Sequence, residues 1–187
     1  GSVSNEMRQD AVIAVAIASI CMLIYVAFRF KDVKFGVSAV LALLHDVLCV
    51  FTVYSVARLS VGSTFIACML TILGYSLNNT IIIYDRIREN RRLMGPKTPY
   101  AELVNASINQ TLTRSIYTSL TTFVAIAAVF VVGSIYGLTS VTTFALPMMV
   151  GIVAGCYSSV CIAGPLYVAW EEHREKKRNA AAPVESK

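Results

Sequence analysis

The sequence predicts an all-α membrane protein with five transmembrane helices, because of its composition and the placement of its charges. Of its 187 residues, 56% are hydrophobic and 14% are charged, and the mean hydropathy is +0.65, which is far more apolar than an average soluble domain. A membrane span needs ~20 mainly apolar residues to cross ~30 Å of hydrocarbon, so a chain of this length has room for about five. The basic residues cluster between the apolar runs, where topology signals lie.

The five predicted spans follow one another along the chain. The first, AVIAVAIASICMLIYVAF, stops at the basic segment RFKDVK, and the second and third each contain a pair of polar residues. The fourth is rich in threonine at its start, and Pro147 and Pro165 are expected to kink the fifth. By residue number, the spans are 11–28, 36–57, 61–84, 115–136 and 141–170.

Polar segments separate or flank these spans. Residues 85–114 form the longest one, predicted as a cytoplasmic loop that Gly95-Pro96 and Pro99 divide into a basic helical extension, a turn and an amphipathic helix. Residues 1–10 are expected to be a lead-in that starts with a cloning remnant, and residues 171–187 a charged cytoplasmic tail that frays. The loop opens with the motif DRIREN, whose polar members are Asp85, Arg86, Arg88, Glu89 and Asn90.

The distribution of Lys and Arg predicts the orientation. Basic residues concentrate in 29–34, in 85–113 and after Trp170, whereas the turn after the second span has only Arg58 and the turn GSIYGLTS has none. By the positive-inside rule, the basic segments face the cytoplasm. We therefore expect the N-terminus outside and the C-terminus in the cytoplasm, with an earlier span and an exported domain before residue 1.

His45 and Asp46 are candidate functional residues in the second span. They lie about ten residues from its start, which is ~15 Å deep at ~1.5 Å per residue. A carboxylate near the bilayer middle costs several kcal/mol unless it is paired or hydrated, so it marks a candidate site. The alternative is a structural hydrogen bond between helices, but the His-Asp pair favours function.

Two adjacent amides, Asn78 and Asn79, lie ~9–10 Å inside the cytoplasmic end of the third span. Arg114 opens the fourth span from the same side, so Asn79 and Arg114 are expected at a similar depth, with the amides lining an interior polar path. The alternative is that the asparagines only bond across helices, at about 0.6 kcal/mol, and that Arg114 snorkels to the headgroups.

The remaining features predict packing rather than chemistry. Gly151 and Gly155 form a GxxxG motif that allows close helix approach, and Gly74 is assigned the same role. Five cysteines lie in apolar runs without the spacing of a metal site, and no phosphate-binding loop, nucleophile elbow or HExxH motif occurs, so we expect no metal, no cofactor, no enzyme and no nucleic-acid partner. Several hydroxyls are expected to bond backbone carbonyls: Thr118, Thr121, Thr122, Ser158 and Ser159.

Four stretches resemble one protein family in collinear order. They are ALLHDV (42–47), GYSLNNTIIIYDRIREN (74–90), SINQTLTRSIYTSLTT (107–122) and GIVAGCYSSVCIAGPL (151–166). Together they are similar to the membrane half of the SecF family, bacterial inner-membrane proteins that work with SecD, over most of residues 7–170. The resemblance implies half of a resistance-nodulation-division type transmembrane bundle, and a complex that uses the proton motive force to assist protein export through SecYEG.

The resemblance also implies residue roles, with one gap. The family usually reads GYS-x-N-D-T, and that aspartate is the intramembrane carboxylate tied to proton flow; here the position is Asn79, which cannot titrate. The family's TLxR arginine falls on Arg114 and its LHD aspartate on Asp46, while a further carboxylate comes from SecD. Either Asn79 is an engineered mimic of a protonated carboxyl group, or this lineage has lost or moved its proton carrier.

Three functions therefore remain open. The first is a SecF-like export subunit whose partners are SecD as a separate or fused chain, SecYEG, YajC and the exported polypeptide. The second is a structural scaffold half in which no proton passes through residue 79. The third is a resistance-nodulation-division type exporter of small molecules or lipids.

Overall fold

The described part of the chain is helical throughout, apart from short connections. The computed structural model describes residues 2–30, 33–95 and 97–181. Its elements are α1 (Ser2–Phe30), α2 (Val33–Val56), α3 (Ser63–Met94), α4 (Tyr100–Ile135), α5 (Thr139–Ser158), the π-helical segment η1 (Ser159–Ala163) and α6 (Gly164–Ala181). The all-α fold class is confirmed.

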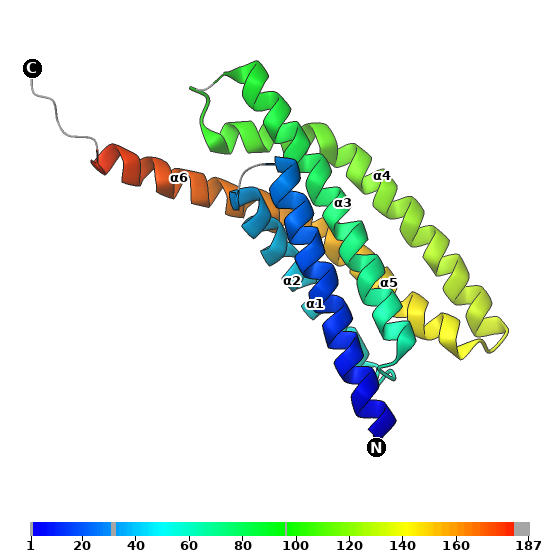
Figure 1. The fold of residues 1–187 in the computed structure, drawn as a ribbon. Helices are drawn as coiled ribbons and strands as arrows, with labels where there is room; N and C mark the ends of the chain where they lie inside the picture. The colour runs from blue at the N-terminus through cyan, green and yellow to red at the C-terminus, as the bar shows by residue number, and fades with distance from the viewer. Residues whose placement is uncertain (1, 31–32, 96, 182–187) are drawn as a thin grey trace, which may run out of the picture.

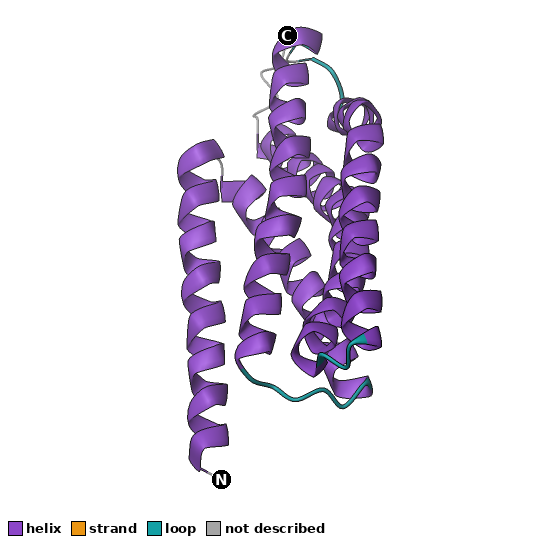
Figure 2. Cartoon of the chain, turned by 90° about the vertical axis from the view of Figure 1, so that its right-hand side faces the viewer, coloured by secondary structure: helices purple, strands orange, loops and turns teal. Residues whose placement is uncertain are grey.

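The helices run alternately up and down (Figure 1). The α1–α2 and α3–α4 connections lie at one end, the α2–α3 and α4–α5 connections at the other, and α6 extends past the first end. Figure 2 shows α3 between α1 and α4. Basic segments that are distant in sequence thus gather at the end where α3 meets α4.

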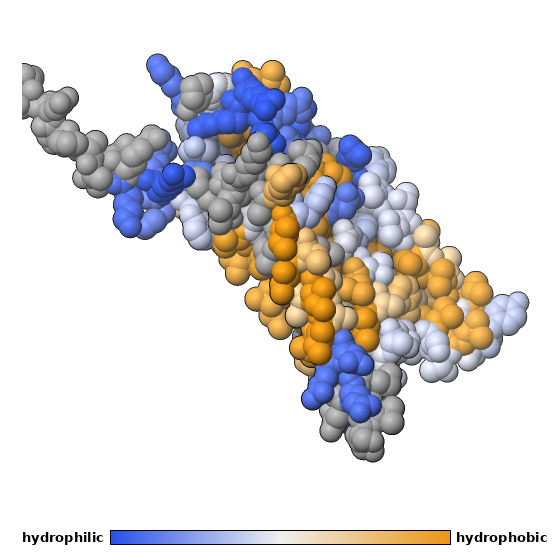
Figure 3. All heavy atoms as spheres, in the orientation of Figure 1, coloured by the Kyte–Doolittle hydropathy of each residue, from blue (hydrophilic) through white to orange (hydrophobic). Residues whose placement is uncertain are grey.

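Four helical segments are long and apolar enough to cross a membrane: Phe35–Val56, Ser63–Met94, Tyr100–Ile135 and Thr139–Lys177. They contain most of the second to fifth predicted spans. The first predicted span falls on α1, whose apolar segment Val12–Cys21 is shorter. Figure 3 shows apolar side chains across the middle of the visible face and hydrophilic ones at both ends, as a lipid environment requires.

The polar stretch 85–114 is mostly helix rather than loop. α3 continues to Met94, and α4 begins at Tyr100 and runs without a break into the fourth predicted span. Gly95 ends α3 with a φ of 84°, a left-handed conformation that glycine adopts without strain. The predicted tail is also helical as far as Ala181, and residues 182–187 lie outside the described part.

The fifth predicted span is interrupted by η1 rather than by a loop. Pro165 follows this π-helical segment almost directly. Proline has no backbone N–H to donate within a helix, and a π turn is one way for a helix to absorb such a defect. Pro147, in contrast, is buried within α5.

α3 and the last membrane-spanning segment form the centre of the packing. Half of the apolar stretch is buried in each of Ser63–Met94 and Thr139–Lys177, compared with 11% in Tyr100–Ile135 on α4. One buried cluster lies around Tyr84, Leu103 and Tyr167, and a second around Met69, Ile72 and Ile152. α4 therefore leaves most of its membrane-spanning surface uncovered by this chain.

Candidate functional site

Asp46 is the meeting point of three helices. It lies on α2 and is 0% exposed. The Ser76 hydroxyl on α3 donates a hydrogen bond to its Oδ2, and the Ser158 hydroxyl on α5 donates to the same oxygen at 2.8 Å. His45 Nδ1 lies 3.2 Å from Oδ1. The carboxylate is thus provided with polar partners instead of being stranded among apolar groups.

Glycines on α5 allow the helices to come this close. A Cβ added at Gly155 would lie 3.2 Å from Cβ of Ser76, and one added at Gly151 would lie 2.4 Å from Cδ1 of Ile72. Both glycines therefore face α3 at the closest approach of the two helices. Gly74 is exposed and an added Cβ would meet nothing within 4 Å, so its assignment to helix packing is wrong within this chain.

A second hydroxyl pair links α3 to η1. Thr80 Oγ1 is 3.0 Å from Ser159 Oγ, and both side chains are buried. Thr80 is one helical turn after Ser76 on α3, and Ser159 follows Ser158 at the start of η1. We call this group, made of Ser76, Thr80, Ser158 and Ser159, the hydroxyl seam.

Most of the hydroxyl seam was not predicted from the sequence. Ser158 and Ser159 were expected to bond backbone carbonyls, and both do contact the carbonyl of Gly155, at 3.4 Å and 2.7 Å. The contact of Ser158 with Asp46 was not expected. The available signal was the i, i+4 spacing of Ser76 and Thr80 on α3, which places two hydroxyls on one face.

The two adjacent amides lie on different faces of α3. Asn78 is exposed and therefore does not line an interior path within this chain. Asn79 is 1% exposed, and neither its Oδ1 nor its Nδ2 has a hydrogen-bond partner among the described residues. A buried amide without a hydrogen-bond partner lowers the free energy of unfolding, so Asn79 is locally destabilising.

The structure does not join Asn79 to Arg114. Three contacts set the register of α3 and α4: Asn90 with Ser107 at 2.9 Å, Arg86 with Gln110 at 2.6 Å and Tyr75 with Ser119 at 2.7 Å. This register places Ser115 rather than Arg114 opposite Asn79. Ser115 is buried and its hydroxyl also lacks a partner among the described residues, whereas Arg114 is exposed. This register fits the expected similar depth of Asn79 and Arg114, but Arg114 occupies the next position around α4 and faces away from Asn79.

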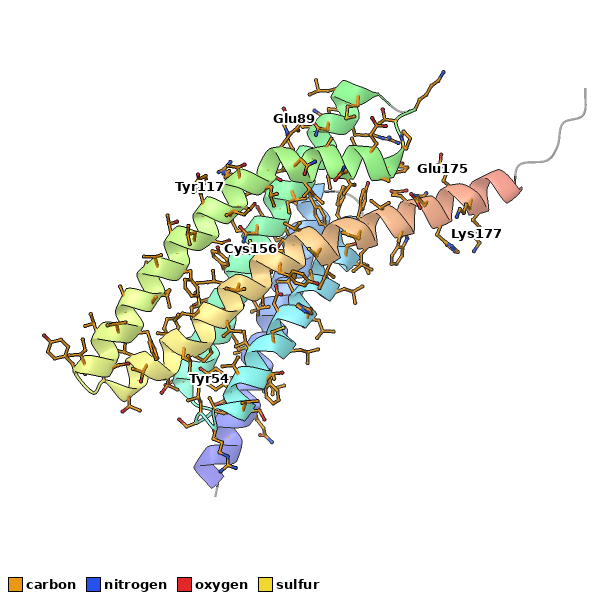
Figure 4. The ribbon with its side chains drawn as sticks, turned by 180° about the vertical axis from the view of Figure 1, so that it is seen from behind. Tyr54, Glu89, Tyr117, Cys156, Glu175 and Lys177 are labelled. Atoms are coloured by element: carbon orange, nitrogen blue, oxygen red, sulfur yellow. The ribbon has the colours of Figure 1, made fainter. Side chains whose placement is uncertain are left out.

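The DRIREN motif ties α3 to α4 at the end of the bundle. Arg86 donates to Gln110 Oε1 and, at 2.6 Å, to Glu89. Asn90 is buried and donates to Ser107 Oγ and to Gln110 Oε1. Figure 4 shows Glu89 at this end and Tyr54 at the other. The motif thus joins α3 to α4 through side-chain hydrogen bonds.

Asp85 and Arg88 lie beside these hydrogen-bonded residues. Both line a hollow on the α3 surface together with Glu89, Arg92 and Leu93. Asp85 also lines a second hollow with Arg114, between α3 and α4. Arg114 is therefore grouped with the polar end of the bundle rather than with the buried polar residues deeper in α3.

The family described as "Protein export membrane protein SecD/SecF, C-terminal" matches residues 1–173. The chain belongs to this family. It is 47% identical over 164 residues to "Protein translocase subunit SecF" of Sebaldella termitidis, covering 88% of this chain and 52% of that protein. It is 45% identical over 181 residues to "Protein translocase subunit SecDF" of Thermus thermophilus, covering 97% of this chain and 24% of that protein. The resemblance found in the sequence is confirmed.

Solved structures agree with this family assignment. The structure titled "Crystal structure of SecDF in Super-membrane-facing form" superposes with a TM-score of 0.84 at 46% identity, covering 95% of this chain and 23% of the other. The chain thus spans about half the length of one SecF relative and about a quarter of the fused SecDF chains. With four apolar helical segments long enough to span a bilayer, this SecD/SecF family chain is a multi-pass membrane protein.

Proposed function

We propose that this chain is the membrane part of a SecF-like subunit that assists protein export through SecYEG, driven by the proton motive force. The observation that carries the proposal is the identity of 47% to a SecF translocase subunit over 88% of this chain. The SecF and SecDF relatives are named translocase subunits, which favours protein export over the export of small molecules or lipids. The subunit performs no covalent chemistry of its own.

The uncovered face of α4 supports a protein partner, SecD, as a separate or fused chain. Arg114, Tyr117, Thr118 and Thr121 are all exposed on this helix, and Tyr117 projects outward in Figure 4. An arginine within a span faces a protein or a water-filled interior far more often than lipid. The relatives that fuse SecD and SecF in one chain fit this arrangement.

The proposed orientation places the α3–α4 end in the cytoplasm of a bacterial cell, with the membrane being the inner one. Arg86, Arg88, Arg91 and Arg92 all lie near this end of α3, as the positive-inside rule requires. SecYEG, YajC and the exported polypeptide would be met through parts of the complex beyond this chain.

A scaffold function is the second candidate, because of Asn79. Its amide cannot exchange a proton in the physiological range, and its two polar atoms have no partner among the described residues. In the scaffold version, this half only holds SecD in place and no proton passes through residue 79.

Complementation distinguishes these functions. The full-length parent protein would be expressed in cells depleted of SecF, and export of a reporter with a signal peptide would be measured with and without an uncoupler. We expect restored export that the uncoupler lowers, and we expect Asn79→Asp to hold or raise the uncoupler-sensitive part, whereas Asn78→Asp, on the exposed face, leaves it unchanged.

Two other outcomes would point elsewhere. Restored export that is indifferent to the uncoupler, with no change in Asn79→Asp, would favour the scaffold. No restored export, accompanied by efflux of dyes or lipids, would refute the export function.

A further inference from the structure

Asp46 stands apart from the other acidic side chains of the described residues. Only Asp46 and Glu171 among them are buried, and Glu171 lies near the start of the charged end of α6, after Trp170. We propose that His45 and Asp46, with the hydroxyls of Ser76 and Ser158, form a proton-binding site within the membrane, in a chain whose residue 79 cannot hold a proton. This inference rests on the proposed proton-driven function and names the group that serves it.

The surroundings of Asp46 can satisfy both protonation states of its carboxyl group. When ionised, it accepts hydrogen bonds from Ser76, Ser158 and His45 Nδ1. When neutral, its O–H can donate to His45 Nδ1 if the imidazole carries its proton on Nε2, and serine hydroxyls donate and accept equally well. His45 Nε2 then faces Cys49 Sγ at 3.7 Å. A purely structural carboxylate would need only the first arrangement.

His45 is the group that can exchange a proton with Asp46. No Lys or Arg is hydrogen-bonded to Asp46 among the described residues, and α3 and α5 present hydroxyls to it rather than charges. The other titratable groups nearby are Cys49 on α2 and Tyr157 on α5. Cys49 Sγ lies 3.7 Å from His45 Nε2, and the Tyr157 ring centroid lies 6.2 Å from that of His45. The His45 side chain is 36% exposed whereas that of Asp46 is 0% exposed, so the pair connects the outer surface of the chain with its interior.

The proton step involves no other reactant. A doubly protonated His45 ring transfers the proton on Nδ1 to Oδ1 of Asp46, so that one N–H bond breaks, one O–H bond forms and two neutral groups remain. The reverse transfer restores the imidazolium and the carboxylate. The other two members of the hydroxyl seam, Thr80 and Ser159, lie 3.0 Å apart and follow Ser76 and Ser158 along their helices.

Protonation of Asp46 would also change how α5 is held. Hydrogen bonds to an ionised carboxylate are roughly twice as strong as neutral ones, and those from Ser76 and Ser158 link α3 and α5 through α2. Neutralising Asp46 weakens both links at the point where α5 gives way to η1 at Ser159. π-helical segments recur at functional sites, and this one begins next to a residue that bonds the carboxylate.

Infrared difference spectroscopy on the full-length protein in lipid vesicles tests the site without depending on export. Spectra would be recorded from about pH 5 to about pH 8, the range in which histidine changes charge. We expect the C=O stretch of a protonated carboxyl group to appear as the pH falls and to shift in deuterated buffer. Asp46→Asn should abolish this band, whereas Glu102→Gln, an exposed acid at the start of α4, should leave it intact.

Ser158→Ala keeps the carboxyl group and serves if Asp46→Asn fails to fold. It removes one hydrogen-bond donor from Oδ2, so the band should move in frequency, and His45→Gln should move the pH at which the band appears. A band that is absent or constant throughout the range, or one that neither Asp46→Asn nor Ser158→Ala alters, would overturn the inference. A titrating Asp46 in a protein that does not support export would refute the proposed function and leave the site standing.

Discussion

Replacing Gly151 with alanine would push a methyl group into the contact between α5 and α3. The added Cβ would lie 2.4 Å from Cδ1 and 2.7 Å from Cγ1 of Ile72, and 3.1 Å from Cγ2 of Val50. Ile72 is 1% exposed and Val50 0%, so Ile72 must change rotamer inside a packed core or α5 must move. Overpacking costs about 1–3 kcal/mol, and replacing a helical glycine returns about 1 kcal/mol. We expect a net loss of about 1 kcal/mol in the free energy of unfolding.

The assay is unfolding in mixed micelles by increasing SDS, followed by circular dichroism. Gly74→Ala is the matched control, because Gly74 is a glycine in a span with no atom near its Cβ position, and it should gain up to about 1 kcal/mol. Ile72→Ala removes both clashing atoms and should cost about 2–4 kcal/mol alone. Combined with Gly151→Ala, the new methyl group fills part of that space, so the double variant should be more stable than the sum predicts by about 1 kcal/mol or more.

Two results would refute this account of the packing. The first is additivity of Gly151→Ala and Ile72→Ala within ~0.5 kcal/mol, which is the behaviour of residues that do not touch. The second is a gain in stability for Gly151→Ala equal to that for Gly74→Ala. Either would mean that α5 does not approach α3 through Gly151.

Three further predictions concern the polar residues and the topology. Asn79→Leu should stabilise the chain in the same unfolding assay by about 1–2 kcal/mol, because it removes two unpartnered buried polar atoms; destabilisation would show that the amide has a partner. Ser158→Ala should cost about 1.5–3 kcal/mol, since it removes a hydrogen bond to a buried carboxylate, whereas Ser134→Ala, an exposed serine bonded only to a carbonyl of its own helix, should change stability by less than ~0.5 kcal/mol. In a cysteine-free background, single cysteines at Gly62 and Ser134 should react with an impermeant maleimide added outside intact cells and one at Lys97 should not; the opposite pattern would invert the orientation.

The membrane class, the order of the helices and the family could all be predicted from the sequence. Apolar runs identify spans regardless of how the helices pack, because lipid imposes the same demand on every span. Long motifs such as GYSLNNTIIIYDRIREN identified the family, because a match over so many consecutive residues is far more specific than a match to a short motif. The sequence was less informative on boundaries: residues 85–114 are polar, but α3 and α4 simply continue beyond the membrane as helices.

The candidate site could be predicted from the sequence only in part. Asp46 was identified because an acid in an apolar run is conspicuous in any sequence. Its partners were not, because Ser76 and Ser158 come from other helices and serine is common in spans. Asn79 was placed in the interior correctly, but its expected relation to Arg114 depended on the rotation of α4, which places Ser115 opposite Asn79 instead.

The sequence by itself determined that this chain is a bundle of membrane-spanning helices from the SecD/SecF family, since span length and motif order are properties of the linear chain. Only the tertiary structure decided which polar groups meet. Rotating a helix by one residue turns its side chains by ~100°, so Asn78 and Asn79, or Arg114 and Ser115, have opposite surroundings despite being neighbours. The convergence of α2, α3 and α5 on Asp46 likewise depends on the close helix approach that Gly151 and Gly155 permit. A GxxxG motif in the sequence shows that some helix can approach closely, but it does not show which one.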